Sequence, residues 1–254
     1  MIEHLSYSSI SLFLDCPEAW RRKYLAQEPT KTSPALVFGT AFHGALEAYL
    51  GAPQTEPVSY WAGAWAKALE RDGSSIDWGI DTPETHCNEG VRLLSNEGVV
   101  RAVKNLTVRQ DSDGPMIERK VTLSVPGVAV PVIGYIDFVA QDGVPCDLKT
   151  SSRAWSSDKA SDSLQSLFYL AALNQAGHDW HQWRFRHVVF TKAKTPQVQV
   201  LEHSHKPAEL FFLFRVVQSV WAAIQSGVFL VNPTGWRCGP QYCDFWAGCR
   251  GRYA

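Results

Sequence analysis

Two acidic side chains and an amine flank a predicted turn near the middle of the chain. Residues 132–150 read VIGYIDFVAQDGVPCDLKT, with apolar runs on both sides of a polar segment that contains Asp142 and ends in glycine. Such a segment is typical of a hairpin turn. Folding the chain about Asp142 places Asp137 opposite Asp147, with Cβ atoms roughly 5 Å apart. Lys149 follows Asp147 by two residues and therefore shares its face of the strand.

This arrangement predicts a metal site. Opposed carboxylates repel each other unless a cation lies between them. Two acids and an amine on one sheet face therefore indicate a divalent cation with a basic or charge-stabilising group beside it. A solvated surface hairpin explains the same short motif equally well. The opposite face of the hairpin is predicted to be apolar and to consist of Ile136, Phe138, Cys146 and Leu148.

A cluster of cysteines near the C-terminus forms a second candidate site. Gaps of four and five residues separate its members, which are Cys238, Cys243 and Cys249. Soft thiolates select zinc or an iron–sulfur cluster. The tail contains no fourth Cys or His, so a fourth ligand must come from elsewhere. Cys16 beside Pro17 is the best candidate, and Cys87 and Cys146 are alternatives, although the apolar surroundings predicted for Cys146 argue against it.

Periodic apolar patterns predict the elements that position these residues. Helices are expected at 6–28 with a break at Cys16-Pro17, 38–50, 61–71, 83–104, 164–176 and 206–229. Strands are expected at 116–123, 128–140, 144–149, 183–191 and 196–203. We expect Ser8 or Ser9 to cap the first helix, 151–162 to be a loop, and the first part of the last helix to be largely buried.

Two predicted helices carry polar pairs four residues apart, and such pairs share one helix face. His43 and Glu47 form one pair, and Gln165 and Tyr169 form the other. A lone helical His is more often structural than a metal ligand. The order of helices, strands, helix, strands and helix predicts a single α/β domain over residues 1–254 with an N-terminal helical portion.

Composition excludes several classes of protein. The 254 residues are 45% hydrophobic and 19% charged, which indicates a globular chain. There is no apolar run of about 18 residues and no basic leader, so we expect a cytoplasmic protein without a membrane span. The net charge of −1 does not indicate nucleic-acid binding. A local basic run is either a solvated strand face or a phosphate track, and it consists of Arg184, Arg186, Lys192 and Lys194.

Six short motifs follow one another along residues 8–250. They are Ser8-Ser9-Ile10 to Tyr24 with Cys16-Pro17, Gly39 to His43, Gly134 to Asp137, Asp147 to Thr150, Gln165 with Tyr169, and the three tail cysteines. In this order they resemble the RecB-like branch of the PD-(D/E)XK nuclease superfamily, in its iron–sulfur form, which includes AddB-type, CRISPR-associated and phage exonucleases. Two departures are the first cysteine gap, which is often two residues, and Asp147 where many members have Glu.

The resemblance implies a fold and a set of roles. The fold would be restriction-endonuclease-like, a mixed central sheet flanked by helices with a C-terminal cysteine-rich staple. The implied Mg²⁺ or Mn²⁺ ligands are His43, Asp137, Asp147 and the backbone carbonyl of Leu148. Lys149 would orient the attacking water or offset negative charge, and Gln165 and Tyr169 would contact DNA or support the site. Cys16 and the tail cysteines would bind a 4Fe-4S cluster, with zinc as the alternative.

The implied activity is hydrolysis of phosphodiester bonds in linear or single-stranded DNA, during recombination, repair or phage DNA processing. Because no helicase motif is present, any unwinding would require a partner such as a helicase, and a single-strand annealing protein is a further possible partner. Two alternatives remain open at this stage. One is a non-catalytic DNA-binding or assembly module that keeps the nuclease fold, and the other is a structural protein held together by zinc.

Overall fold

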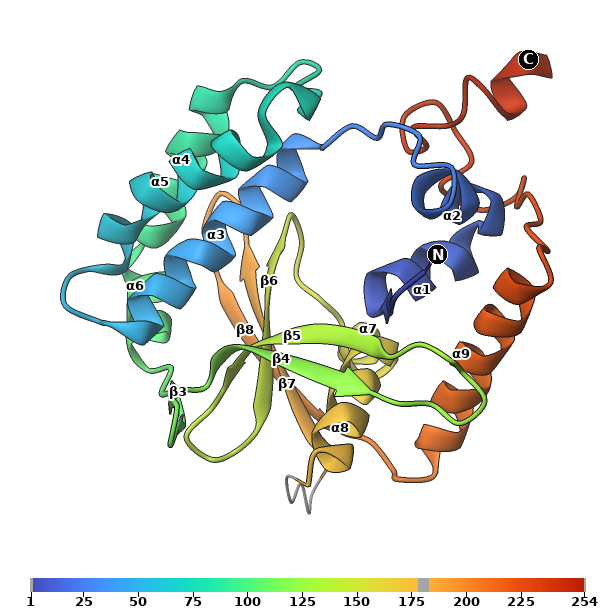
Figure 1. Cartoon of the computed structure of the whole chain (residues 1–254). Coiled ribbons are helices and arrows are strands. Elements are labelled where there is room, and N and C mark those ends of the chain that lie inside the picture. The colour runs from blue at the N-terminus through green and yellow to red at the C-terminus, as the bar shows by residue number, and fades with distance from the viewer. Residues whose placement is uncertain (1, 178–182, 254) are drawn as a thin grey trace.

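A mixed β-sheet forms the centre of the protein (Figure 1), which is described by a computed structural model over residues 2–177 and 183–253. The sheet order is β1-β5-β6-β7-β8, and β4 pairs with the other edge of β5. The β1–β5 and β6–β7 pairs are parallel and the others are antiparallel. The bounds are β1 Leu5–Ser6, β4 Ile117–Leu123, β5 Val132–Val139, β6 Pro145–Ser151, β7 Arg184–Thr191 and β8 Val198–Ser204, with a separate ribbon of β2 Gln110–Asp111 and β3 Gly114–Pro115.

Helices cover both faces of the sheet and enclose two apolar cores. One core lies against α1 (Tyr7–Asp15), α8 (Leu164–Gln175) and α9 (Glu209–Gln225). The other lies beneath α3 (Pro34–Gly51), α4 (Trp61–Asp72), α5 (Pro83–Leu94) and α6 (Glu97–Lys104). The remaining elements are α2 Pro17–Tyr24, α7 Ser157–Ser161, and the 3₁₀ turns η1 Pro57–Tyr60, η2 Gly73–Ser75 and η3 Arg250–Tyr253.

The central hairpin is confirmed, but its strands separate early. Phe138 pairs with Cys146 and Val139 pairs with Pro145, as the folding about Asp142 predicts. No further β5–β6 pair follows, so the backbones of Asp137 and Asp147 are not paired. On the same edge of β5, β1 pairs only with the first two residues of the strand. Residues 134–137 of β5 therefore lack a neighbouring strand on this edge.

The predicted apolar face of the hairpin is wrong for one residue. Phe138, Cys146 and Leu148 pack into the core beneath α3, whereas Ile136 packs into the opposite core. The strand therefore changes the face it presents between Ile136 and Phe138. Glu118 lies at the same level of β4 and has a φ of 48°, in the left-handed region. Asp137 thus occupies the position where β5 twists out of regular alternation.

The helices differ from their predicted bounds for local reasons. Ser6 caps α1 rather than Ser8 or Ser9, and its side chain accepts a hydrogen bond from Ser9 N. The predicted break is confirmed, because Cys16 has extended backbone dihedrals and α2 begins at Pro17. The predicted helix 83–104 is two helices, since the Asn96 side chain caps a new one.

Two further sequence predictions are wrong. The expected loop 151–162 contains α7, which Ser156 caps. In α9 the first turns are not buried, because Phe211 and Phe212 are 74% and 61% exposed. No helix in the described parts of the chain combines the length and the hydropathy needed to cross a membrane.

Candidate active site

The open edge of β5 is closed by side chains instead of a strand. Asp137 is 8% exposed, and its Oδ2 accepts a hydrogen bond of 2.5 Å from the Leu148 backbone N–H. In a continuous hairpin, that N–H would face the β5 backbone. Further along the edge, the Tyr169 hydroxyl donates to the Tyr135 carbonyl at 2.7 Å. The separation of the two strands thus leaves room for an acidic group where backbone pairing would otherwise lie.

Asp147 and Lys149 lie on β6 beside this opening. Asp147 is 2% exposed, and its Oδ1 accepts a 2.8 Å hydrogen bond from Lys149 Nζ. The ammonium is also 2.7 Å from Oδ2, but Oδ2 forms no hydrogen bond. Burial, together with the Asp137 charge, raises the pKa of Asp147 to about 6 against the pull of Lys149. Burial disfavours the Lys149 ammonium, yet the charge and hydrogen bond of Asp147, together with the Asp137 charge, outweigh burial and raise the Lys149 pKa.

His43 reaches the same place from α3. Its Nδ1 lies 3.6 Å from Asp137 Oδ2. Burial opposes a charged imidazole here, but the hydrogen bond and charge of Asp137 outweigh it and raise the pKa of His43. The structure therefore brings four side chains that are far apart in sequence into one cluster, namely His43, Asp137, Asp147 and Lys149. The predicted role of the Leu148 carbonyl remains a prediction, since only its N–H is seen to contact Asp137.

The cluster has the donors that a hard divalent cation needs, although not yet in a metal-binding arrangement. Across residues 2–177 and 183–253, no three His, Cys, Asp or Glu side chains are grouped so that they could hold one ion. Both oxygens of Asp147 lie within 2.8 Å of the Lys149 ammonium. What fits a divalent cation is the chemistry of the donor set, two buried carboxylates with an imidazole nitrogen beside one of them. Carboxylate oxygens suit Mg²⁺, and the imidazole makes Mn²⁺ suitable as well.

A second acidic pair borders the cluster, and sequence analysis did not identify it as such. Glu47 lies one turn after His43 on α3, and its carboxyl group lies beside that of Glu118 of β4. Partial burial and the Glu47 charge raise the pKa of Glu118 to about 8, although solvent contact weakens this effect. Glu118 lies at the level of Asp137 across β4 and β5. The signal that could have identified Glu118 is its position opposite Asp137 in the β4–β5 pair. The alternating pattern of β4 by itself predicts only that Glu118 is exposed.

Gln165 and Tyr169, the predicted polar pair on α8, support the open edge of β5. Gln165 Nε2 donates to the Tyr169 hydroxyl at 3.2 Å, and Tyr169 itself is only 6% exposed. The helix can approach β5 because residue 134 is glycine. A Cβ on Gly134 would lie 2.6 Å from a ring carbon of Phe168 and 3.1 Å from Tyr169. These contacts favour the supporting role of Gln165 and Tyr169 over direct contact with DNA.

His187 of β7 is a buried neighbour that sequence analysis missed. It pairs in register with Asp147, is 0% exposed, and neither ring nitrogen has a hydrogen-bond partner. Its ring stacks on His203 with centroids 5.4 Å apart. Burial, and then the neighbouring His203, lowers the pKa of His187 to about 3, so the ring is neutral beside the acidic cluster. Nothing in its local sequence distinguishes it from other strand residues.

The two arginines of the basic run are neutralised by carboxylates. Arg184 is paired with Glu202 at 2.9 Å, and Arg186 is paired with Asp142 at 2.8 Å. Lys192 lies over the Phe38 ring, 4.8 Å from its centroid. These contacts favour the solvated strand face over a phosphate track.

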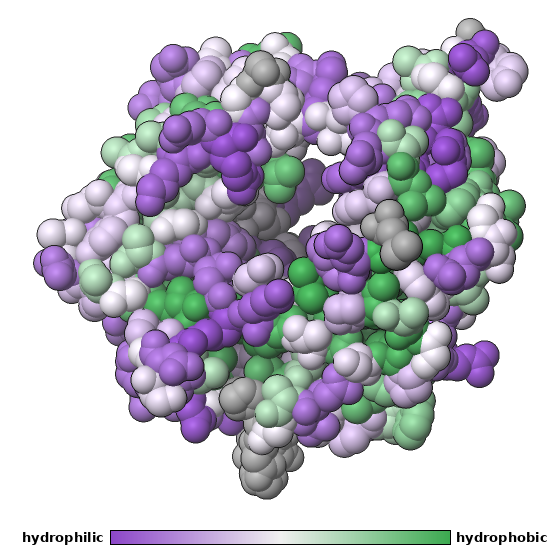
Figure 2. All heavy atoms as spheres, in the orientation of Figure 1, coloured by the Kyte–Doolittle hydropathy of each residue, from purple (hydrophilic) through white to green (hydrophobic). Residues whose placement is uncertain are grey.

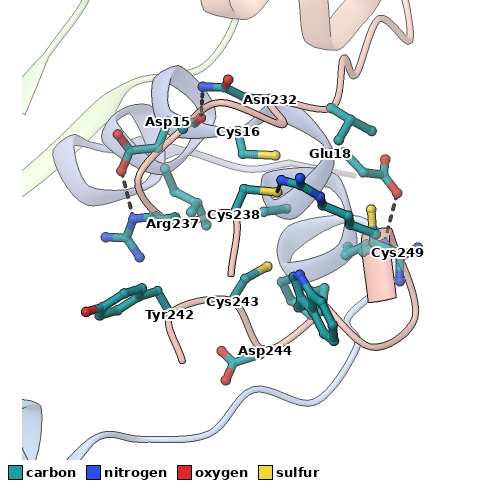
Figure 3. Close-up of a pocket in the computed structure, with 18 of the residues that line it drawn as sticks. Asp15, Cys16, Glu18, Asn232, Arg237, Cys238, Tyr242, Cys243, Asp244 and Cys249 are labelled. Carbon is teal, nitrogen blue, oxygen red and sulfur yellow. Dashed lines mark hydrogen bonds and ion pairs between the residues drawn. The ribbon is translucent and has the colours of Figure 1, made fainter. Parts of the chain in front are cut away.

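The four predicted cysteine ligands meet in one pocket between α1, α2 and the C-terminal tail (Figure 3). All four are free thiols, namely Cys16, Cys238, Cys243 and Cys249. The alternatives lie elsewhere: Cys146 is buried in the core beneath α3, and Cys87 packs at the edge of the same core. Burial raises the pKa of Cys243, and the neighbouring thiols add to this.

Polar contacts hold the tail against the first helices around this pocket. Arg237 Nε donates to Asp15 Oδ2 at 2.8 Å, and Asn232 Nδ2 donates to the Asp15 carbonyl at 2.9 Å. Arg22 Nη2 donates to the Gly248 carbonyl at 3.1 Å. These contacts join α1 and α2 to the cysteine-rich tail.

A mixed sheet flanked by helices, with acidic residues where its central strands diverge, defines the restriction-endonuclease-like class of fold. The profile of the PD-(D/E)XK nuclease superfamily matches residues 4–250, and the chain belongs to that superfamily. A crystal structure of an exonuclease candidate from Eubacterium rectale is 13% identical, with a TM-score of 0.60 over 98% of this chain and 88% of that one. The structure of SSO0001 is also 13% identical over 94% and 95% of the two chains, with a TM-score of 0.33. No curated protein sequence matches.

Proposed function

We propose that the protein is a metal-dependent DNA exonuclease that hydrolyses phosphodiester bonds in linear or single-stranded DNA. Membership of a nuclease superfamily makes a nucleic acid the substrate. The observation that carries the proposal is the buried group of Asp137, Asp147 and His43 beside a charged Lys149, at the place where β5 and β6 separate. Burying two carboxylates close together costs stability, which favours a functional site over a purely structural one.

Each residue has a defined task in this proposal. Asp137, Asp147, His43 and the Leu148 carbonyl would hold Mg²⁺ or Mn²⁺. A cation bound there polarises the scissile phosphate and lowers the pKa of the attacking water. Lys149 keeps its proton and therefore offsets negative charge on the phosphate instead of acting as a base. Tyr169 and Gln165 hold the β5 backbone, so that Asp137 stays in position.

The four cysteines would bind a 4Fe-4S cluster. In such a cluster each thiolate binds a different iron, so the four sulfur atoms need not surround one ion. Zinc, which needs four ligands at about 2.3 Å from one centre, is the alternative. An anaerobically purified protein with broad visible absorbance, iron and acid-labile sulfide would support the cluster, and a colourless protein with one zinc would contradict it.

The exonuclease proposal is tested with DNA labelled at either end. Single- and double-stranded linear DNA, labelled at the 5′ or the 3′ end, is incubated with Mg²⁺ or Mn²⁺. Release of short products from one end supports an exonuclease and gives its polarity. Binding without cleavage of any form would instead support a DNA-binding or assembly module. A helicase would supply the single strand by unwinding duplex DNA, and a single-strand annealing protein is a further possible partner.

A further inference from the structure

Trp236 differs from the other tryptophans of the protein because it is exposed. Its side chain is 66% exposed, whereas the other tryptophans within residues 2–177 and 183–253 are buried or half-buried. Tyr242, which follows in the same tail, is 59% exposed. One apolar side chain on a surface is ordinary, but two large aromatic rings side by side form a patch that a ligand can cover.

The two rings are held in contact before any ligand is bound. Their centroids are 5.7 Å apart and their planes meet at 62°, which is an edge-to-face arrangement. The guanidinium carbon of Arg237 lies 4.7 Å from the centroid of the Trp236 ring. Arg237 is itself fixed, because its Nε donates to Asp15 Oδ2 at 2.8 Å. We call Trp236, Arg237 and Tyr242 the aromatic platform.

Tight turns fix the backbone that carries the aromatic platform. Cys238 N donates to the Gly235 carbonyl at 2.9 Å, and Tyr242 N donates to the Gly239 carbonyl at 3.1 Å. In Figure 3, the Tyr242 ring points away from the sulfur atoms of the labelled cysteines, and Arg237 lies on the same side. The platform is therefore preorganised on the outer surface of the tail, so that little conformational entropy is lost when it binds a ligand.

The surroundings of the aromatic platform are positively charged and hydrophilic. Residues 232–253 contain three arginines and a single acidic residue, although the whole chain has a net charge of −1. Arg250 Nη1 donates to the Pro233 carbonyl at 2.9 Å, which places this guanidinium beside the turn that precedes Trp236. Arg250 and Arg252 are both exposed, so their charges are available to an anionic ligand. On the face shown in Figure 2, hydrophilic residues gather around the tail and α2 at the upper right.

These two properties together select one class of ligand. Exposed aromatic rings beside positive charge are what proteins use to bind single-stranded nucleic acids, since each unpaired base offers a face for stacking and each phosphate offers a negative charge. A duplex keeps its base faces stacked inside and cannot offer them. An apolar protein or lipid surface does not match the arginines and the hydrophilic border. The aromatic platform is therefore suited to an unpaired strand.

We propose that Trp236 and Tyr242 stack on the bases of a single DNA strand. The aromatic platform lies apart from the proposed catalytic residues, since Arg237 and Tyr242 line the cysteine pocket and none of the catalytic residues does. This inference rests on the proposed nuclease function, because it takes the substrate strand as the ligand. It goes further by giving that strand a second contact, which tolerates any base sequence.

Binding of a fluorescent oligothymidylate to the inactive Asp137→Asn protein, at constant salt, tests the platform without digestion. Adding Trp236→Ala should raise Kd by about 5- to 150-fold, because the stacking of one base is lost. Phe211→Ala is the matched control, since Phe211 is 74% exposed but lies on α9, and its Kd should be unchanged. Fluorescence anisotropy measures both values. An unchanged Kd for the Trp236 variant would overturn the proposal.

An abasic strand separates stacking from a structural effect of the substitution. This strand has the same length and the same phosphates but carries no bases. Trp236→Ala should weaken binding of the thymidylate strand and leave binding of the abasic strand unchanged, and Trp236→Phe, which keeps a ring, should restore most of the lost affinity. Equal weakening for both strands would contradict the proposal, because it would show that Trp236 only supports the fold of the tail.

Failure of the two proposals can be told apart. The wild-type protein is incubated in parallel with linear single-stranded DNA and Mn²⁺. If this DNA stays intact, the exonuclease proposal fails, while the comparison of thymidylate and abasic strands still decides whether the aromatic platform stacks on bases. If the DNA is digested and the Trp236→Ala substitution does not change Kd, only the platform proposal fails.

Discussion

Lys149 is the residue whose charge state separates two mechanisms. Its ammonium is held by Asp147, whose charge and hydrogen bond help to raise the Lys149 pKa against the effect of burial. In the proposed mechanism Lys149 is therefore protonated and stabilises developing negative charge on the phosphate instead of accepting a proton from water.

Replacing Lys149→Ala tests this role. We expect kcat to fall by about 100- to 1,000-fold, because one positive charge at the phosphate is removed. Lys120 on β4 is exposed and serves as the matched control, since Lys120→Ala should leave kcat unchanged. Kinetics on linear single-stranded DNA are measured with a parallel unfolding curve, because Asp147 loses its partner. An unchanged kcat for the Lys149 variant would remove this residue from the mechanism.

The pH dependence of metal binding follows from the shifted pKa values. The pKa of Asp147 is raised to about 6 and that of His43 is raised as well, so both hold protons more tightly than in the unfolded chain. Their contribution to metal-free stability is therefore present at acidic pH and is lost as the pH rises through these pKa values. Metal ligands must be deprotonated, so affinity should change in the opposite direction.

We accordingly expect the increase in Tm caused by Mn²⁺ to grow as the pH is raised from about 5 to about 8. Thermal unfolding with and without Mn²⁺ across this range measures the effect. An increase in Tm that does not change with pH would show that neither Asp147 nor His43 binds the ion.

Residue types and spacing predicted the members of the site better than its geometry. Asp137, Asp147 and Lys149 lie together as the hairpin pattern predicted. The prediction that the two aspartates lie directly opposite each other was wrong, because it assumed that backbone pairing between β5 and β6 continues past Phe138 and Cys146. Here the Leu148 N–H is bonded to a carboxylate instead. Glu118 was missed since its proximity depends on a left-handed residue that strand alternation cannot reveal.

At the scale of elements, α8 and β5 fit together only because Gly134 has no side chain. The ideal Cβ position is 2.6 Å from Phe168, a distance that requires the helix or the strand to move. Since Tyr169 on this helix holds the open edge of β5, a displacement here would also disturb Asp137.

The substitution Gly134→Ala should lower the free energy of unfolding by about 1–3 kcal/mol, as overpacking does in other cores. Gly63→Ala in the middle of α4 is the matched control, because nothing lies within 4 Å of its Cβ position. That control should be more stable by about 0.5–1 kcal/mol. Chemical denaturation of both variants gives the comparison, and a Gly134 variant as stable as the wild type would show that α8 does not need this close approach.

Helix and strand periodicity predicted most elements, and the failures have physical causes. The helix 83–104 divides because a capping side chain at Asn96 competes with continued helix. The first turns of α9 carry exposed Phe211 and Phe212, and apolar composition alone cannot show that no partner covers them. Strand alternation likewise places Ile136 and Phe138 on one face of β5, whereas in the structure they pack into opposite cores.

At the scale of the whole molecule, the cysteine pocket joins the first two helices to the C-terminal tail. Cys16 comes from the α1–α2 junction, and the other three cysteines come from residues 238–249 (Figure 3). Sequence spacing predicted this long-range contact, because three thiols in a short tail need a fourth ligand.

The Cys16→Ser substitution should abolish visible absorbance and lower Tm, since the cluster would lose one of its four ligands. Cys87→Ser is the matched control, because Cys87 packs at the edge of the core beneath α3 and lies outside the pocket. Absorbance spectra and iron content of anaerobically purified protein measure the result. Identical spectra for the Cys16 variant and the wild type would exclude Cys16 as a ligand.

The most direct test of the central claim is digestion of linear single-stranded DNA with Mn²⁺ by the wild type and by Asp137→Asn, with Asp113→Asn as the exposed control. The asparagine keeps an oxygen that can accept from Leu148 N–H, so the fold should be retained. We predict that the wild type and the Asp113 variant degrade the strand, while the Asp137 variant degrades it at a rate lower by more than about 100-fold. Equal digestion by all three proteins, or none by the wild type, would contradict it.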